Sequence, residues 1–251
     1  DLYRPFKEKK KTKATEAIAK GLEPLAEFLL SFPKTDVIQE AKKYINDDVK
    51  DENEALEGAQ FIIAERISDD ANYRKYLRDY LFKHGALITS LRKGGKALDT
   101  KGVYEIYYDY SQPISKVKPH QILAINRAES EKVISVKLDG TKDAMENYLI
   151  QQVKEKPSNA DSYLEAAAID SLKRLIFPSI EREIRSELSE KGEDQAIEVF
   201  ADNLSKLLLQ PPLKGKVILG IDPAFRTGCK WTVVDQTGQV LEKGVIYPHE
   251  Q

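Results

Sequence analysis

The sequence is poor in the residues that carry most metal and redox chemistry. Its 251 residues include one cysteine, Cys229, and three histidines, His84, His120 and His249, which lie far apart. A single cysteine excludes an internal disulfide and any zinc site built from cysteine pairs, and it suits a reducing cytoplasm. Cys229 lies beside Trp231 in a strand-like run, where a cysteine is more often a small buried apolar side chain than a nucleophile.

Other signals are missing too. No apolar run approaches the ~20 residues that a membrane-spanning helix needs, and the first residues, DLYRPFK, contain no signal-peptide core. Neither a Walker loop nor a dinucleotide fingerprint is present, because Gly94-Gly95 lacks the required spacing. We therefore expect no membrane partner, no cofactor and no small-molecule substrate. The chain begins without methionine and stops in strand-like sequence, so we expect a piece of a longer protein.

What the sequence has is charge, distributed in blocks. Charged residues make up 32% of the chain, yet the formal net charge is only −2. Residues 36–57 are acidic, whereas residues 1–13 and 83–102 are basic. The cations of the two basic blocks are Arg4, Lys7, Lys9, Lys10, Lys11 and Lys13 in the first, and Lys83, Arg92, Lys93, Lys96 and Lys101 in the second. Local charge of this kind bears on partners, whereas the total does not.

The basic blocks are the main functional signal before the last forty residues. Lysine and arginine near a phosphate backbone release counterions and give affinity without sequence preference. We therefore expect nucleic-acid contacts from both blocks, with Arg92, Lys93 and Lys96 chosen from the second. Two alternatives stay open. The cations can belong to a solvated surface or a disordered arm, and the acidic segment with its many helices can serve as a protein-interaction scaffold.

Helical periodicity dominates the first 210 residues. Apolar residues recur at three- and four-residue spacing, and the predicted helices are residues 12–20, 22–31, 35–44, 54–68, 70–84, 119–128, 142–154, 159–177, 179–190 and 193–209. We expect Pro178 and Gly192 to end helices, and Gln210-Pro211-Pro212 to mark the domain boundary. A tyrosine row on residues 70–84 suits a core stripe, with base stacking as the lesser alternative.

A short β-prone region interrupts the helices. Residues 86–91, 104–110 and 133–138 are predicted as strands, residues 92–96 as a flexible basic turn, and residues 111–119 as a polar loop. The predicted fold is therefore mainly α: a multi-helix scaffold with a small α/β insertion, covering residues 1–210.

From residue 216 the period is that of strands. An apolar run ends at Asp222, a Pro-Ala-Phe-Arg-Thr-Gly turn follows, and residues 229–235 and 240–247 complete three antiparallel strands. This is how an RNase H-like domain begins, and there the first acid helps to hold two Mg²⁺ ions. Asp222 can equally accept turn N–H bonds or pair with Arg226, and Asp235 should lie at the far end of its strand. We therefore expect no catalytic or metal site here, with Asp222 as a remnant of one.

The residues also resemble a known family. LYRPFKEKKKTKATEAIAKGLEPLA (residues 2–26), YYDYSQP (107–113), KPHQILAINRAESE (118–131) and LLLQPPLKGKVILGIDPAFRTGCKWTVVDQTG (207–238) are similar to the bacterial Tex transcription accessory proteins. The resemblance implies a cytoplasmic nucleic-acid-binding protein with a helical scaffold that includes a helix-turn-helix part. A YqgF-type RNase H-like domain, helix-hairpin-helix motifs and an S1 RNA-binding domain are expected after the scaffold.

On this resemblance, residues 216–251 are the first three strands of a truncated RNase H-like α/β domain. The family's DPxxRTG motif falls on Asp222, Pro223, Arg226, Thr227 and Gly228, which makes Arg226 and Thr227 candidate phosphate contacts. The implied partners are RNA, DNA or both, together with the transcription machinery. A metal-dependent nuclease in the longer protein is a further alternative that the resemblance leaves open.

Overall fold

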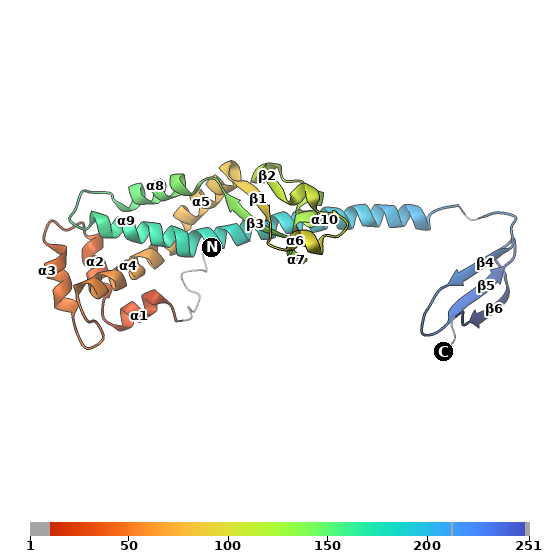
Figure 1. Cartoon of the computed structure of the whole chain (residues 1–251), viewed down its shortest axis with the longest axis horizontal. Coiled ribbons are helices and arrows are strands. Elements are labelled where there is room, and N and C mark those ends of the chain that lie inside the picture. The colour runs from red at the N-terminus through yellow and green to blue at the C-terminus, as the bar shows by residue number, and fades with distance from the viewer. Residues whose placement is uncertain (1–10, 212, 249–251) are drawn as a thin grey trace. The chain divides into compact units, whose positions relative to one another are not determined.

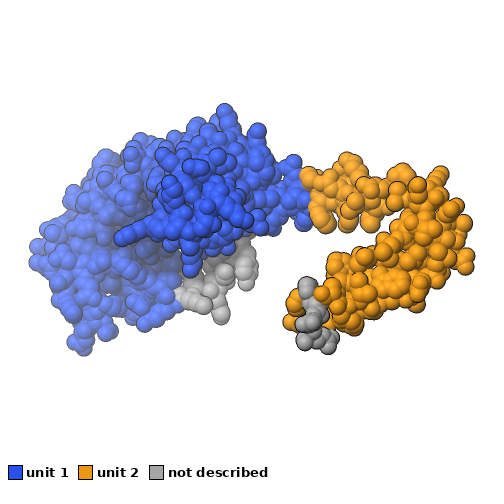
Figure 2. Space-filling view, turned by 45° about the vertical axis from the view of Figure 1, so that its right-hand side comes forward, with its two compact units in different colours: residues 1–197 blue, residues 198–251 orange. Residues whose placement is uncertain are grey.

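The computed structural model describes residues 11–211 and 213–248. The chain divides into two compact units, residues 1–197 and 198–251 (Figures 1 and 2). Helices dominate the first unit, which also holds one three-stranded sheet, and a second three-stranded sheet lies in the other unit. The predicted fold class is confirmed. No helix in the described ranges is long and apolar enough to span a bilayer.

The first five helices lie close to their predicted limits, and side-chain caps mark where four of them begin. They are α1 (Lys13–Ala19), α2 (Glu23–Leu30), α3 (Val37–Ala41, continued by a 3₁₀ turn, Lys42–Tyr44), α4 (Glu52–Asp69) and α5 (Ala71–His84). Side-chain oxygens of Thr12, Asp36, Asp51 and Asp70 accept hydrogen bonds from backbone N–H groups of the first turns. Each such cap stabilises its helix by about 1 kcal/mol.

Helix α4 is the centre of the first core. Its buried face includes Ala55, Leu56, Ala59, Ile62 and Ile63, and it packs against α1, α2 and α9. Full burial of one such leucine or isoleucine stabilises the fold by roughly 1.5–3 kcal/mol. This face matches the apolar stripe that the sequence predicts for residues 54–68.

The first sheet has the strand order β2-β1-β3 and is antiparallel throughout. Its strands are β1 (Ala86–Leu91), β2 (Asp109–Pro113) and β3 (Ile134–Asp139); between them lie the short helix α6 (Gly95–Leu98), the 3₁₀ turns Glu105–Tyr107 and Ile114–Lys116, and α7 (Pro119–Ser130). The strand predicted at residues 104–110 is wrong for most of its length, because the 3₁₀ turn occupies that segment. The predicted loop at 111–119 contains the end of β2 instead.

Two predicted helix ends are also wrong. After α8 (Lys142–Val153), helix α9 (Asp161–Asp170) passes through a π-helical segment, Ser171–Ile176, directly into α10 (Phe177–Leu208). Pro178 lies in the first turn of α10, just after this π segment. Its missing N–H is tolerated there, because the π segment just before it already interrupts the regular hydrogen-bond ladder. Gly192 lies buried within α10 and does not end it.

The second unit contains a meander in the order β4-β5-β6. The strands are β4 (Ile218–Asp222), β5 (Cys229–Val234) and β6 (Val240–Ile246), all antiparallel, as predicted. Asp235 shapes the turn between β5 and β6, since its carboxylate accepts bonds from the backbone N–H groups of Thr237 and Gln239. A hairpin turn therefore joins β5 to β6 at Thr237-Gly238, with Gly238 at φ +88°.

Candidate nucleic-acid interface

The second basic block lies at one edge of the first sheet. Arg92 follows β1. Its backbone N–H donates a hydrogen bond to the backbone carbonyl of Val133 at 3.0 Å, just before β3 begins. Antiparallel pairing therefore brings Lys132 beside the segment that follows β1. We name the cations of residues 92–101, together with Lys132, the basic rim: Arg92, Lys93, Lys96, Lys101 and Lys132.

Two glycines make the tight turn that carries the rim. Gly94 has φ +82°, a left-handed conformation that costs other residues about 1–2 kcal/mol. Gly95 is buried, and a β-carbon there would stand 2.1 Å from the Val133 carbonyl oxygen. Glycine is thus required at both positions, for backbone conformation at the first and for close approach at the second. The turn predicted as flexible contains the start of α6 and is fixed against β3.

The basic rim is exposed and its charges are not neutralised. All five side chains are exposed, and none forms an ion pair within the described part of the chain. Other cations of the same unit are paired: Arg66 with Glu23 and Glu27, Arg78 with Glu183 and Glu187, and Arg185 with Glu129. Among the described residues, the rim therefore gathers several unpaired cations in one short stretch of chain, whereas other unpaired lysines of the unit, such as Lys42 and Lys75, lie apart in the sequence.

A buried aspartate fixes the loop beside the rim. The Asp99 carboxylate accepts the N–H groups of Val103 and Tyr104 at 2.8 Å and the Tyr108 hydroxyl at 2.9 Å. Burial alone raises the pKa of Asp99, but these bonds and one from Gly102 outweigh it, so the pKa lies below its usual value. The charged carboxylate of Asp99 therefore holds two backbone N–H groups and the Tyr108 hydroxyl around itself. This explains why residues 99–108 do not pair as a strand.

Most of the first basic block lies outside the described residues, namely Arg4, Lys7, Lys9 and Lys10. Its last two members are described. Lys11 pairs with Glu16 at 3.2 Å, and the Lys13 amine lies 4.2 Å from the ring centroid of Phe61. Both are thus engaged by neighbours in the same unit. Such exposed contacts are weak, so a phosphate can still compete for these amines.

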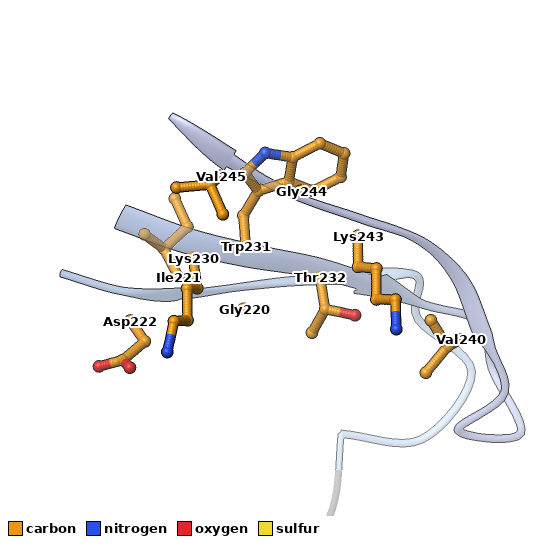
Figure 3. A pocket seen from close by; sticks show the side chains of 10 residues that line it. All are labelled: Gly220, Ile221, Asp222, Lys230, Trp231, Thr232, Val240, Lys243, Gly244 and Val245. Atoms are coloured by element: carbon orange, nitrogen blue, oxygen red, sulfur yellow. The ribbon is translucent and has the colours of Figure 1, made fainter. Parts of the chain in front are cut away.

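In the second unit, a hollow of about 910 Å³ lies over the sheet around Gly220. Asp222, Lys230, Thr232 and Lys243 extend to the same side of the sheet, whereas Trp231 points to the other (Figure 3). The strand register explains this arrangement, because Asp222 pairs with Lys230 and Thr232 pairs with Lys243. This side of the sheet therefore carries one carboxylate and two amines (Figure 3).

The DPxxRTG turn follows this strand end. Arg226 and Thr227 are exposed, and Gly228 is buried with φ +76°. A β-carbon on Gly228 would stand 2.6 Å from Val245 and 2.7 Å from Tyr247. Because Gly228 has no side chain, the turn can pack directly against β6. Arg226 and Thr227 lie on the outside of the turn.

The surroundings of Asp222 bear on the nuclease alternative. Its carboxylate has no hydrogen-bond or ion-pair partner among residues 11–211 and 213–248, so neither the expected turn bonds nor the pairing with Arg226 is present there. Asp235 follows Val234, which pairs with Ile218 at the opposite end of β4, and the predicted separation of the two acids is confirmed. No group of three or more His, Cys, Asp or Glu residues suited to a metal occurs within those ranges.

Sequence reasoning missed three of these cations. Lys132, Lys230 and Lys243 belong to no charge block, and each reaches its neighbours only through strand pairing. Alternation along residues 229–234 places Lys230 and Thr232 on one face, which is the one signal that was readable. The register that adds Lys243, and that brings Lys132 to the rim, is a property of the folded sheet.

The geometry defines a class of protein: a helical scaffold with a basic sheet edge, joined to a small sheet that begins an RNase H-like domain. Comparison with known families agrees with this class. The model of the Tex central region matches residues 33–200, and the model of the Tex protein YqgF-like domain matches residues 216–251. The chain belongs to the Tex family.

Relatives match along almost the whole chain. It is 51% identical to the Bacillus subtilis protein YdcI over 99% of the chain and 35% of the relative. It is 34% identical to the transcriptional accessory protein Tex of Neisseria gonorrhoeae, over 100% of the chain and 34% of that protein. It is 35% identical to human S1 RNA-binding domain-containing protein 1, over 98% of the chain and 26% of the relative. The chain thus spans about a third or less of each.

Proposed function

We propose that this chain binds RNA or DNA through the basic rim, as part of a cytoplasmic transcription accessory protein. The single observation that carries the proposal is the unneutralised charge of the rim, in a unit whose other arginines are largely paired. The names of two relatives, a transcriptional accessory protein and an S1 RNA-binding domain-containing protein, support the same role. The chain acts as a binding scaffold, not as an enzyme.

The physics of this contact is electrostatic. Lysine and arginine side chains that neutralise phosphates release condensed counterions, so affinity falls steeply as salt rises. The turn that carries most of these cations is already ordered, so binding has to fix their side chains but not the backbone of the turn. The rim carries no aromatic stacking platform, so we expect weak preference for sequence.

The second unit adds a further contact in this proposal. Lys230 and Lys243 lie on one side of the sheet, and Arg226 and Thr227 lie in the adjoining turn. Together they offer cations and a hydroxyl to a phosphate near the end of β4. Asp222 disfavours an anion at its own carboxylate, so the contact is expected on the lysine side of the hollow.

The test is a binding titration of labelled single-stranded RNA and double-stranded DNA, followed by fluorescence anisotropy over a salt series. Arg92→Glu/Lys93→Glu/Lys96→Glu should weaken both by roughly tenfold or more at low salt. The matched control is Lys42→Glu/Lys75→Glu/Lys156→Glu, which makes the same change in net charge at exposed sites elsewhere in the unit. Equal losses in the two variants would show a net-charge effect only, and unchanged affinity in the first would remove the rim from the interface.

A further inference from the structure

Three aliphatic side chains stand in solvent beside the basic rim. Leu98, Val103 and Ile106 are 60%, 64% and 72% exposed, although all three belong to one short, well-ordered segment. We name this set the aliphatic loop. Isolated exposed aliphatic residues are ordinary, but three within nine residues, in the same stretch as several cations without an ion pair among the described residues, are the kind of feature that points to an interaction site.

The segment is held rigidly, so the exposure is not a sign of loose packing. Asp99 binds the N–H groups of Val103 and Tyr104, and Tyr104 and Tyr107 are 6% and 5% exposed in the core. The chain thus buries the tyrosines on either side of Ile106 while it presents Ile106 itself. A fixed surface loses little entropy on binding, which favours a partner.

We propose that the aliphatic loop docks an acidic, amphipathic segment of a protein partner. Charge complementarity identifies the occupant: Arg92, Lys93, Lys96 and Lys101 lie in the same stretch of chain and have no acidic partner among the described residues. A segment with apolar side chains at three- and four-residue spacing and carboxylates between them would satisfy both features at once. Acidic–hydrophobic alternation of this kind is common in disordered regulatory segments.

The chemistry favours a peptide over the two other candidate surfaces. Nucleic-acid bases stack on aromatic rings, and the exposed side chains here are aliphatic. Stable membrane attachment usually adds aromatic anchors or a lipid chain, and the aliphatic loop offers only three aliphatic side chains. This inference goes beyond the proposed function, because its apolar contacts have no role in phosphate binding.

The probe is a synthetic helical peptide of about 18 residues, with leucines at three- and four-residue spacing and glutamates at the other positions. A scrambled peptide and a lysine-for-glutamate version serve as peptide controls. Leu98→Ser/Val103→Ser/Ile106→Ser should weaken binding of the acidic peptide to the 251-residue chain by at least about tenfold. The matched control, Ile18→Ser/Ile38→Ser/Ile45→Ser, removes three other exposed aliphatic side chains and should bind as the unaltered chain does.

Each outcome of the peptide-binding experiment either supports or overturns the proposed docking of an acidic peptide. Support requires binding of the acidic peptide, loss of it in the loop variant alone, and RNA affinity in that variant within about twofold of the unaltered chain. Circular dichroism should show an unchanged fold, since the replaced side chains are exposed. No binding of the peptide at about 1 mM, or equal binding by the loop variant, overturns the proposal. The proposal is also overturned if the loop variant loses its affinity for RNA or for vesicles of anionic lipid instead. Rim variants that keep their affinity for RNA but lose the acidic peptide would contradict only the proposed function, whereas rim variants that keep full peptide binding would overturn this inference.

Discussion

Gly192 of α10 and Ile122 of α7 approach so closely that a β-carbon does not fit between the two helices. Built on Gly192, that carbon would stand 2.8 Å from Cγ2 of Ile122 and 3.2 Å from the carbonyl oxygen of Pro119. Alanine at this position would gain about 1 kcal/mol in helix propensity but lose about 1–3 kcal/mol through overpacking. The close contact, not helix termination, accounts for the glycine.

Gly192→Ala should therefore lower the free energy of unfolding by about 1 kcal/mol net. Urea unfolding followed by circular dichroism measures it. Gln195→Ala, at an exposed position one turn along the same helix, is the control and should change stability by less than about 0.5 kcal/mol. A more stable Gly192→Ala protein would mean that α7 and α10 can move apart at little cost.

Local sequence signals predicted the helices well where an apolar stripe marks them. The stripe predicted on residues 54–68 is the buried face of α4, although the helix starts two residues earlier, where Asp51 caps it. The signals failed at Pro178 and Gly192, because each normally ends a helix when judged from its neighbours alone. In this fold the π segment accommodates the first, and close packing on α7 requires the second.

The sequence predicted only part of the candidate site, because only some of its residues lie close together in the chain. Arg92, Lys93 and Lys96 are adjacent in sequence, so composition reveals them. Lys132 joins them through the pairing of β1 with β3, and the aliphatic loop depends on the hydrogen bonds of Asp99. Contacts of long sequence separation set both features, and periodicity within one element does not contain that information.

The two glycines of the rim turn provide a second test. Gly94→Ala meets no atom within 4 Å, so its cost is the left-handed backbone alone, about 1–2 kcal/mol. Gly95→Ala would place a β-carbon against the backbone carbonyl of Val133, which cannot be relieved by a change of rotamer. We expect it to cost at least about 2–3 kcal/mol and to reduce RNA affinity as the rim moves. Thermal unfolding and anisotropy measure the two effects, and equal costs at both positions would contradict this account.

Replacing Tyr76 and Tyr148 tests whether the tyrosine row stabilises the fold or stacks on nucleic-acid bases. Their rings stack with centroids 3.9 Å apart, and Tyr80 approaches the Tyr76 ring from α5 with centroids 6.0 Å apart. The row thus stacks on itself and joins α5 to α8. A double-mutant cycle of Tyr76→Ala and Tyr148→Ala should give a coupling energy of about 0.5–1.5 kcal/mol. RNA affinity should stay unchanged in both single variants, and a loss there would revive base stacking as the function of the row.

The lowered pKa of Asp99 predicts how the stability of the fold depends on pH. Its pKa is lower in the folded state than the ordinary value of 3.8, so its contribution is present above that value and is lost as pH falls through the folded pKa. Asp99→Asn removes the charged acceptor, and the Tm should drop by several degrees at pH 7. The difference in Tm between the two proteins should shrink below about pH 4, where Asp99 of the unfolded chain begins to bind a proton while the folded carboxylate still resists protonation because of its lower pKa. Asp194→Asn, at an exposed position of α10, is the control, and a pH-independent difference at Asp99 would refute the linkage.

The salt dependence of RNA binding tests the basic rim most directly. Each phosphate of a single strand that the protein no longer neutralises should reduce the slope of log affinity against log salt by about 0.7. Arg92→Gln/Lys93→Gln/Lys96→Gln should thus lower the slope by about 2 if all three cations bind phosphates. Anisotropy titrations at several salt concentrations give the slope without reference to the absolute affinity. Lys42→Gln/Lys75→Gln/Lys156→Gln changes the net charge equally and should leave the slope unaltered, because those amines lie outside the rim. A slope that stays constant in the rim variant would place the phosphate-binding cations elsewhere, with Lys230 and Lys243 as the next pair to replace.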